Sequence, residues 1–270
     1  MIERLEWKRR AARVYSHLRP SPAPDKPVSV VLTYHSVGTG PLALPSDVFR
    51  RQMEWLKQNT SVVSLSELVK GQIQSSKAGI VCAITFDDGY ASVHRYALPI
   101  LRELGLPATI YLVAGAIGDH ERKSSSQFDG LYPNEDMLIW QEASELQANG
   151  VQLGSHLVHH KDLTALDAAT ASEELAMSKR LIEDKSGAQC ASFCYPWGKH
   201  NQRTIEAVRK AGYGNAVTAI QDRWNGIPHD PFQIPRADIR RDYTIDDFAA
   251  VVRGDWDFLG YIQRFRRWMN

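Results

Sequence analysis

The 270-residue sequence lacks several features that would fix its class at once. It has only three cysteines, Cys82, Cys190 and Cys194, and none lies in a C-x-x-C pair. So sparse and odd a set excludes a disulfide-stapled scaffold and favours a reducing compartment. No apolar run reaches the roughly 18 residues of a membrane-spanning helix, and the basic N-terminal segment lacks the apolar stretch of a secretory signal. We therefore expect a cytoplasmic protein.

An excess of charge of one sign is also absent. The chain carries 32 Lys and Arg against 31 Asp and Glu, a formal net charge of +1. No global field attracts nucleic acid, so we expect no nucleic-acid partner. Hydrophobic residues make up 43% of the chain and charged residues 23%, which excludes a disordered chain. The length allows one large α/β barrel or two small domains.

Short apolar, β-branched runs alternate with longer helical patterns from residue 28 onward. This alternation predicts an α/β fold with a parallel sheet and helices outside it, and seven runs suffice for a distorted barrel. A long polar loop over residues 118–136 interrupts the pattern, and loops of that length are usually functional or mobile. The seven runs cover residues 28–35, 79–88, 107–115, 151–156, 191–196, 214–219 and 232–236.

Both ends of the chain are basic and contain aromatic or aliphatic residues. We expect residues 1–27 to form a helical arm and a Pro-rich linker, residues 28–254 a barrel domain, and residues 255–270 a short helical tail. The first eighteen residues carry five Lys and Arg against two Glu. These arms either touch an anionic membrane surface, at the inner membrane, or pack on the barrel or on a second subunit. The sequence does not fix the oligomeric state.

Polar side chains gather where the predicted strands end. In a parallel barrel the carboxyl ends of the strands face one mouth, and active sites form there. The sequence thus brings two carboxylates, imidazoles and a guanidinium to a single rim. The residues at these ends are His35, Asp87, Asp88, His156, Tyr195 and Arg236.

Two of these clusters have the spacing of a metal site. His156 and His160 are four residues apart, which lets two imidazoles reach one ion, although three His in five residues also suit a surface turn. Asp87-Asp88-Gly89 is by itself compatible with a turn, but adjacent carboxylates need a compensating cation or Arg. Two imidazoles and one carboxylate form a hydrolytic zinc set, and the second carboxylate is then free to act as a base.

These motifs resemble those of a known family. Residues 85–90 (TFDDGY), the His156 and His160 pair followed by Leu163, and residues 193–198 (FCYPWG) occur in the order typical of the polysaccharide deacetylase family. This is the NodB homology domain of carbohydrate esterase family four. The resemblance covers residues 28–250 and leaves out both arms. It implies a distorted (β/α)7 barrel that removes N-acetyl groups from an amino-sugar polysaccharide or a lipid-linked oligosaccharide.

The resemblance also implies a metal centre and a base. Asp87 resembles the general base, and Asp88, His156 and His160 resemble the ligands of one divalent ion. Zn²⁺ is the expected ion, with Co²⁺, Ni²⁺ or Mn²⁺ as alternatives, because affinity order alone does not decide occupancy. The expected partner is an N-acetylated glycan substrate.

The third motif and the last strand supply further contacts. Tyr195 resembles the residue whose backbone N–H helps to bind the oxyanion and the substrate. Trp197 follows it and either stacks on a sugar face or packs in the core. Arg236 resembles the Arg that holds the base carboxylate in place, because the third motif here lacks the Arg found in other branches.

Two departures from the family pattern matter. Leu157 stands where Thr or Ser usually follows the first His, which removes a hydroxyl near the metal. No Leu-x-His occurs near the C-terminus, where many members carry the general acid. His35 instead follows the first strand, as in poly-N-acetylglucosamine deacetylases, and is the candidate acid. Its alternative is a buried His that caps the strand end.

Other functions fit part of the pattern. The same fold supports an amidohydrolase that acts on a small non-sugar amide, because fold does not fix the substrate. A non-catalytic glycan-binding relative is the other alternative. A pure binder has no need of a carboxylate base beside a metal set, so the pairing of Asp87 with Asp88 favours an enzyme.

Overall fold

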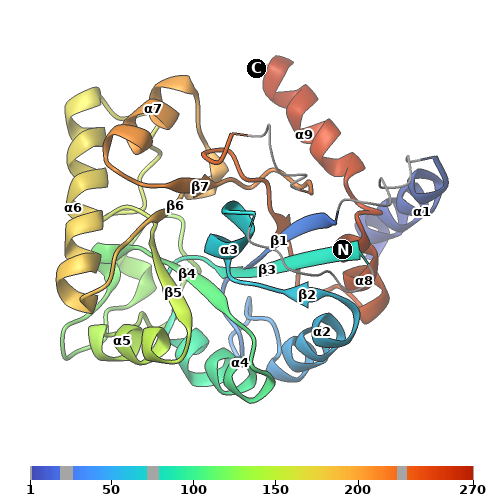
Figure 1. Cartoon of the computed structure of the whole chain (residues 1–270), viewed down its shortest axis with the longest axis horizontal. Coiled ribbons are helices and arrows are strands. Elements are labelled where there is room, and N and C mark those ends of the chain that lie inside the picture. The colour runs from blue at the N-terminus through green and yellow to red at the C-terminus, as the bar shows by residue number, and fades with distance from the viewer. Residues whose placement is uncertain (1, 19–26, 72–78, 224–229, 270) are drawn as a thin grey trace.

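Parallel strands form the centre of the molecule, and helices surround them (Figure 1). The computed structural model describes residues 2–18, 27–71, 79–223 and 230–269, with side chains between residues 5 and 265, so the expected Pro-rich linker lies outside the described residues. The strands are β1 (Val28–Tyr34), β2 (Ser61–Val62), β3 (Ile80–Phe86), β4 (Ala108–Leu112), β5 (Val151–Ser155), β6 (Ser192–Cys194), β7 (Asn215–Val217) and β8 (Ala237–Asp238).

The order of the strands matches the predicted alternation. The main path runs β7-β6-β5-β4-β3-β1-β8, and every pairing along it is parallel. Every residue of β1 and β4 is buried, as expected for strands covered by helices on one face and by the barrel interior on the other. The architecture is therefore the α/β barrel that the sequence predicts.

Helices follow most of the strands and cover the outside of the sheet (Figure 1). Among the described residues no helix is long and apolar enough to cross a membrane. The helices are α1 (Ile2–Leu18), α2 (Ser46–Asn59), α3 (Leu65–Val69), α4 (Leu98–Leu104), α5 (Trp140–Ala148), α6 (Ala168–Ser186), α7 (Gln202–Lys210), α8 (Ile245–Arg253) and α9 (Phe258–Met269).

The seventh strand differs from the prediction. Residues 232–236 are not a strand: only Ile234 forms a bridge, to Val217 of β7, and the strand that pairs with β1 is β8. Pro235 has no N–H to donate to a ladder, so a regular strand cannot continue through it. The irregular segment bonds to β7 and the chain then reaches β1, which distorts this side of the barrel.

Strand β2 is a second difference from the predicted set. It has two residues, too few to give a hydrophobic period, and it pairs with the first half of β3. Strand β4 pairs with the second half of the same edge, where Thr85 and Phe86 face Thr109 and Ile110. The carboxyl end of β3 thus lies between β1 on one edge and β4 on the other. The acidic pair follows directly on this end.

The N-terminal helix packs against the last helices of the barrel. Leu5 and Ala12 of α1 are buried in the main core, and Arg9 forms a two-pronged contact with Asp247 of α8, at 2.8 and 2.6 Å. Trp7 meets Phe258 of α9 edge-on. Residues close to the two ends of the chain therefore lie side by side.

Candidate active site and metal centre

The candidate residues follow directly on buried strands. His35 comes after β1, Asp87 and Asp88 after β3, and His156 after β5. The backbone ladder continues one step into the site, because the N–H of Asp87 donates to Tyr34 at 2.9 Å and that of His156 to Leu112 at 2.8 Å. These bonds fix the backbone positions of Asp87 and His156, so the polar residues at the strand ends lie at one rim, as the sequence predicts.

Asp88, His156 and His160 form a compact buried cluster. Asp88 Oδ1 lies 3.6 Å from His156 Nε2 and 3.9 Å from His160 Nε2, and all three side chains are buried. The ligand atoms lie within 4.8 Å of one another. These separations are too long for hydrogen bonds, whereas the ligand atoms of a tetrahedral zinc site lie about 3.4 Å apart. The spacing therefore fits an ion between the three side chains.

The two imidazoles are held in the tautomer that binds a metal. His156 Nδ1 is 2.8 Å from the Cys194 carbonyl, and His160 Nδ1 is 2.8 Å from the Asp129 carbonyl. A carbonyl only accepts, so each Nδ1 carries the proton and each Nε2 keeps its lone pair. Burial, followed by the neighbouring His160, lowers the pKa of His156 to about 4, so its imidazole is neutral at physiological pH.

The long polar loop takes part in this arrangement. Asp129 lies within the loop over residues 118–136, and its backbone carbonyl orients His160. Sequence reasoning missed this contact because a backbone acceptor leaves no signature in side-chain identity. The loop thus contacts the candidate metal centre through this hydrogen bond, in addition to any role in covering a substrate.

Strained backbone marks the same region. Among the described residues, five that are not glycine have a positive φ angle, and four of these five lie at the rim of the site. Such conformations cost of order 1–3 kcal/mol each and persist where the surroundings impose them, often at functional sites. The four are Asp88 (φ 75°), Leu157 (67°), His160 (51°) and Trp197 (53°), and the fifth is Asn134 (60°).

Leu157, the departure from the usual hydroxyl residue, belongs to the core. Its side chain is fully buried in the main hydrophobic cluster, while its backbone carbonyl accepts from the N–H of Ala114 at 2.9 Å. The residue therefore anchors the bend between the two His ligands by packing.

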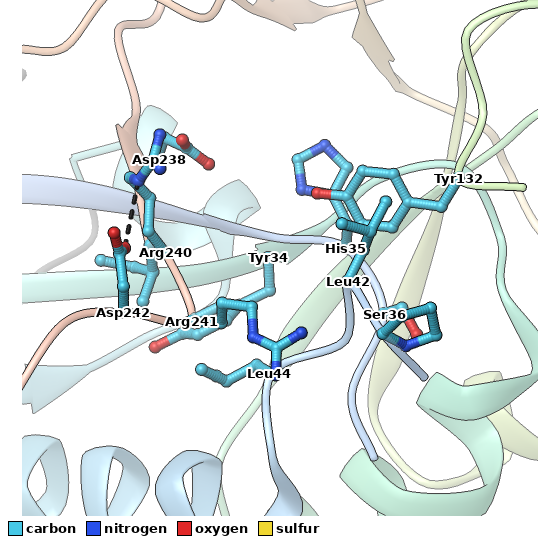
Figure 2. Close-up of a pocket in the computed structure, with 12 residues that line it drawn as sticks. Tyr34, His35, Ser36, Leu42, Leu44, Tyr132, Asp238, Arg240, Arg241 and Asp242 are labelled. Carbon is cyan, nitrogen blue, oxygen red and sulfur yellow. Dashed lines mark hydrogen bonds and ion pairs between the residues drawn. The ribbon is translucent and has the colours of Figure 1, made fainter. Parts of the chain in front are cut away.

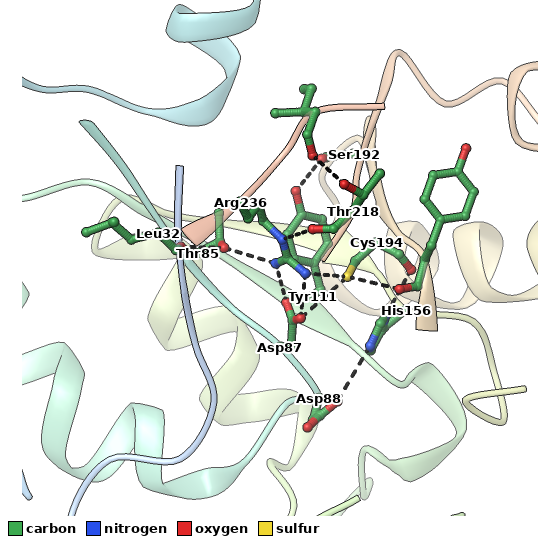
Figure 3. A network of polar contacts seen from close by, with 12 residues as sticks. Leu32, Thr85, Asp87, Asp88, Tyr111, His156, Ser192, Cys194, Thr218 and Arg236 are labelled. Atoms are coloured by element: carbon green, nitrogen blue, oxygen red, sulfur yellow. Dashed lines mark hydrogen bonds and ion pairs between the residues drawn. The ribbon is translucent and has the colours of Figure 1, made fainter. Parts of the chain in front are cut away.

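Asp87 lies beside the cluster and is held by a buried guanidinium. Arg236 Nη1 and Nη2 each donate to one oxygen of Asp87 at 2.7 Å, and Figure 3 shows the end of the guanidinium directed at the carboxylate. Burial raises the pKa of Asp87, but the Arg236 charge and its hydrogen bonds outweigh burial and bring the pKa well below its usual range. Asp87 is therefore ionised at neutral pH.

Arg236 itself is fully satisfied in the interior. Its Nε donates to the Thr218 carbonyl at 2.9 Å, and Nη1 also donates to Thr85 Oγ1 at 3.1 Å. The role that the resemblance implies for Arg236 thus matches its position. It reaches Asp87 from just before β8 rather than from the end of a strand, which corrects the predicted placement.

Cys194 is a site residue that sequence reasoning did not assign. Arg236 Nη2 donates to its Sγ at 3.1 Å, and the thiol donates to Asp87 Oδ2 at 3.5 Å. Burial raises the pKa of Cys194 well above its ordinary value, so the thiol stays protonated. Its place at the end of β6, within the third motif, was the available signal.

A second group of possible ligands overlaps the first. Asp87, His156 and Cys194 also have ligand atoms within 4.8 Å of one another. Asp87 is already neutralised by Arg236, and a protonated thiol is a poor ligand, because metals bind thiolate. Asp88, His156 and His160 are therefore the better metal centre among the described residues.

His35 reaches the rim from β1 and adjoins a cavity. It is half-buried, its ring stacks on Tyr132 at 5.4 Å, and it is close enough to Asp87 to help lower the pKa of that carboxyl. Figure 2 shows His35 and Tyr132 on one side of a cavity of about 420 Å³, with Arg240 and Asp238 across it. This cavity offers room for a ligand beside His35.

Tyr195 and Trp197 differ sharply in exposure. Tyr195 is buried, and its backbone N–H donates to the Val217 carbonyl at 3.2 Å. Trp197 is 45% exposed, its ring centroid lies 4.4 Å from that of His160, and it covers Gly130, where a Cβ would come within 2.4 Å of the indole. The exposure excludes a core role for Trp197 and places an aromatic surface beside the metal cluster.

The Arg236 contact gives a stability prediction. Arg236→Lys keeps the charge but loses the two-pronged geometry, so we expect the free energy of unfolding to fall by about 2 kcal/mol, measured by urea titration. Arg50→Lys is the matched control, because Arg50 makes the same two-pronged contact with Glu103 on the surface, at 2.9 and 2.8 Å. No measurable change is expected there. Equal losses of stability in Arg236→Lys and Arg50→Lys would contradict the view that burial makes the Arg236–Asp87 contact the stronger one.

Comparison with known proteins places this site in context. Residues 74–216 match the family model described as polysaccharide deacetylase. YxkH of Bacillus subtilis, named as a polysaccharide deacetylase, is 30% identical over 198 residues, or 72% of this chain and 66% of that protein. A poly-β-1,6-N-acetyl-D-glucosamine N-deacetylase of Staphylococcus epidermidis is 24% identical over 77% of this chain and 70% of its own. The match thus leaves about a third of each relative uncovered.

Solved structures share the fold. The Streptococcus pyogenes deacetylase PplD in complex with acetate gives a TM-score of 0.71 at 19% identity, over 86% of this chain and 99% of that one. IcaB from Ammonifex degensii gives 0.67 at 23% identity, over 85% and 97%. At these identities the likeness shows the fold alone.

Proposed function

Because the chain belongs to the polysaccharide deacetylase family, we propose that it hydrolyses N-acetyl groups on the amino sugars of a glycan. The observation that carries the proposal is the buried cluster of Asp88, His156 and His160 with the ionised Asp87 beside it. Relatives named as poly-β-1,6-N-acetyl-D-glucosamine N-deacetylases make N-acetylglucosamine oligomers the first substrates to test.

The cluster fits one divalent ion by its chemistry as well as its spacing. Two neutral imidazole nitrogens and one carboxylate oxygen suit Zn²⁺, with Co²⁺, Ni²⁺ or Mn²⁺ as alternatives. When bound, such an ion polarises the acetyl carbonyl and makes water a better nucleophile. The fold pairs Asp87 with Arg236, outside the proposed ligand set, so this carboxylate stays available for proton transfer.

Asp87 is the proposed general base. An amide is a weak electrophile, so the attacking water must lose a proton as it adds to the carbonyl, and an ionised carboxylate within reach accepts that proton. The two hydrogen bonds from Arg236 keep Asp87 charged and fix its plane. The same bonds lower the pKa of Asp87 and so make it a weaker base. The site thus gains a fixed orientation of the carboxylate at the expense of its basicity.

His35 is the proposed general acid. The amine of the sugar is a poor leaving group until it is protonated, and an imidazole can hand on a proton near neutral pH. His35 follows the strand next to the one that carries Asp87, and it borders the cavity lined by Tyr132 and Leu42. A sugar in that cavity would lie against His35, which is close enough to Asp87 to affect the pKa of that carboxyl.

The oxyanion donor is proposed to come from the third motif. The N–H of Tyr195 is engaged by Val217, so it can serve only by giving up that bond. The N–H of Trp197 has no acceptor among the described residues, and its left-handed backbone takes it out of the sheet ladder. We therefore favour Trp197 as the donor, with its exposed ring as a stacking surface for a pyranose.

The acid role of His35 predicts a dependence on the leaving group. We expect His35→Gln to lower kcat for N-acetyl hydrolysis by about 100-fold, while hydrolysis of an aryl acetate is almost unchanged, because a phenolate leaves without a proton. Acetate release from the two substrates measures the difference. Asp87→Asn serves as the contrast and should impair both. Equal losses on the two substrates after His35→Gln would refute the assignment.

Acetate release from N-acetylglucosamine oligomers tests the function itself. The protein is stripped with a chelator, assayed, and assayed again after addition of Zn²⁺ or Co²⁺. Activity that returns with the metal supports a metal-dependent deacetylase. Turnover of a small non-sugar amide alone would instead favour an amidohydrolase, and glycan binding without acetate release would favour a non-catalytic relative.

A further inference from the structure

The exposed hydrophobic residues of this protein gather on its two terminal helices. In the described part of the chain ten large hydrophobic side chains are exposed, and six of them lie on α1 and α9. Large contiguous apolar patches on a protein surface usually mark a binding site. The six are Trp7, Val14, Leu18, Tyr261, Ile262 and Phe265, which we call the arm surface.

Helix α1 has two apolar faces. Leu5 and Ala12 are buried against the barrel, whereas Trp7, Val14 and Leu18 are exposed, the last two 61% and 77%. Residues at i, i+7 and i+11 share one side of an α-helix, at about 100° per residue. Leu5 and Ala12 lie on nearly the opposite side. Packing on the barrel therefore explains one stripe only. In the second stripe Trp7 contacts Phe258 of α9, while Val14 and Leu18 stay more than half exposed.

The exposed faces of the two helices belong to one region. Trp7 and Tyr15 of α1 contact Phe258 of α9, with ring centroids 6.3 and 5.8 Å apart. In Figure 1, α1 lies on the right of the molecule, opposite α6, and α9 runs from there to the top. Side chains close to the two ends of the sequence thus form one surface, which a single partner could cover.

Charge separates this region from the rest of the molecule. The two helices contain eight Lys and Arg and two Glu, a formal charge of +6. The whole chain carries +1, so the remainder carries −5. Arg9 and Arg264 are paired with Asp247 and Asp222, whereas Arg10 and Arg13 are exposed on α1 beside the apolar stripe. The contrast points to a negatively charged partner.

We propose that the arm surface binds an anionic lipid bilayer peripherally, with the aromatic rings in the headgroup layer and the Arg side chains on lipid phosphates. Exposed aromatic and aliphatic residues beside Lys and Arg are the composition of interfacial helices. A second copy docked through the same surface is disfavoured, because two basic regions would repel each other. This proposal is independent of the catalytic assignment, since its test measures binding and not acetate release.

Vesicle co-sedimentation of the full chain tests the proposal. We expect the protein to pellet with vesicles that contain phosphatidylglycerol and to stay in solution with vesicles of phosphatidylcholine alone. Raising the salt concentration should release it, because screening shortens the reach of surface charges. Arg10→Gln combined with Arg13→Gln should lower the partition coefficient by about fivefold for each charge removed.

Apolar variants separate insertion from simple charge attraction. Trp7→Ser combined with Phe265→Ser should lower the partition coefficient by about tenfold for each ring removed from the headgroup layer. Met177→Ser is the matched control, because Met177 is 41% exposed on α6, at the other end of the molecule. It should bind like the parent protein. Circular dichroism and thermal unfolding verify that each variant is folded.

Three results would overturn the proposal. They are failure of the folded parent protein to pellet with phosphatidylglycerol vesicles at low salt, an equal loss of binding in Met177→Ser, and unchanged binding in the double aromatic variant. Light scattering adds a fourth: a stable dimer that Trp7→Ser with Phe265→Ser dissociates would assign the arm surface to a second copy.

Discussion

Replacing Asp87 by Asn is expected to lower kcat for acetate release by about 1000-fold while the protein still binds its metal. The amide is nearly isosteric with the carboxylate but cannot accept the proton of the attacking water, and general base catalysis is worth roughly 10²- to 10⁴-fold. Asp88, His156 and His160 are untouched by the change. Metal content after dialysis, measured beside the rate, separates the two properties.

Asp87→Asn also leaves a buried Arg236 without its counter-ion, and a lone buried charge costs about 3–5 kcal/mol. Loss of activity could then reflect loss of structure. The double variant Asp87→Asn with Arg236→Met removes both charges and is expected to regain stability over Asp87→Asn. If Asp87 is the base, the stabilised double variant remains inactive. Recovery of activity in it would show that Asp87 serves only to balance Arg236.

The second large effect is expected at the metal centre. His156→Ala removes one of three ligands, so metal affinity should fall by more than the roughly 10- to 100-fold that loss of a supporting contact costs. Acetate release should fall to background at stoichiometric metal. Metal analysis and titration with Zn²⁺ or Co²⁺ measure both. We expect about one ion for each parent chain, held by Asp88, His156 and His160.

His159→Ala provides a control in the same segment. Its imidazole lies between the two ligands in sequence, but it points to Glu174 at 2.6 Å and is half-exposed. Metal content and kcat should match those of the parent protein. If His156→Ala kept its metal, or if His159→Ala lost it, Asp88, His156 and His160 would not be the centre.

The stability, leaving-group and metal experiments examine different parts of one arrangement. Arg236 acts only through Asp87, because its other hydrogen-bond partners, Thr85, Thr218 and Cys194, have no part in the proposed mechanism. His35 is separate from that pair and approaches from β1. We therefore expect the variants of Asp87, His35 and His156 to remove the base, the acid and a metal ligand separately, each without loss of the other two.

Much of the fold and of the ligand set could be predicted from the sequence. The apolar runs over 28–35, 79–88 and 151–156 correspond to β1, β3 and β5, because a buried parallel strand needs apolar residues at consecutive positions. The last residues of those runs are polar, and parallel strands bring them to one rim. His156 and His160 are close in sequence, so their proximity depends on a short bend alone.

The failures of prediction have a common cause. A strand was expected over 232–236, where the hydrophobic pattern gives no weight to the missing N–H of Pro235 or to the pairing of Ala237 with Leu32. Strand β2 was too short to detect, since two residues have no period. Both depend on which neighbour the chain meets after folding.

The sequence by itself determined the α/β alternation and the identity of the groups at the strand ends, because both follow from local periodicity. Only the tertiary structure decided how those groups are held. Arg236 reaches Asp87 across 149 residues, Cys194 joins them from β6, and the Asp129 carbonyl orients His160 from a loop. Such contacts form between segments far apart in the chain, where packing and burial, rather than neighbouring residue types, select the partner.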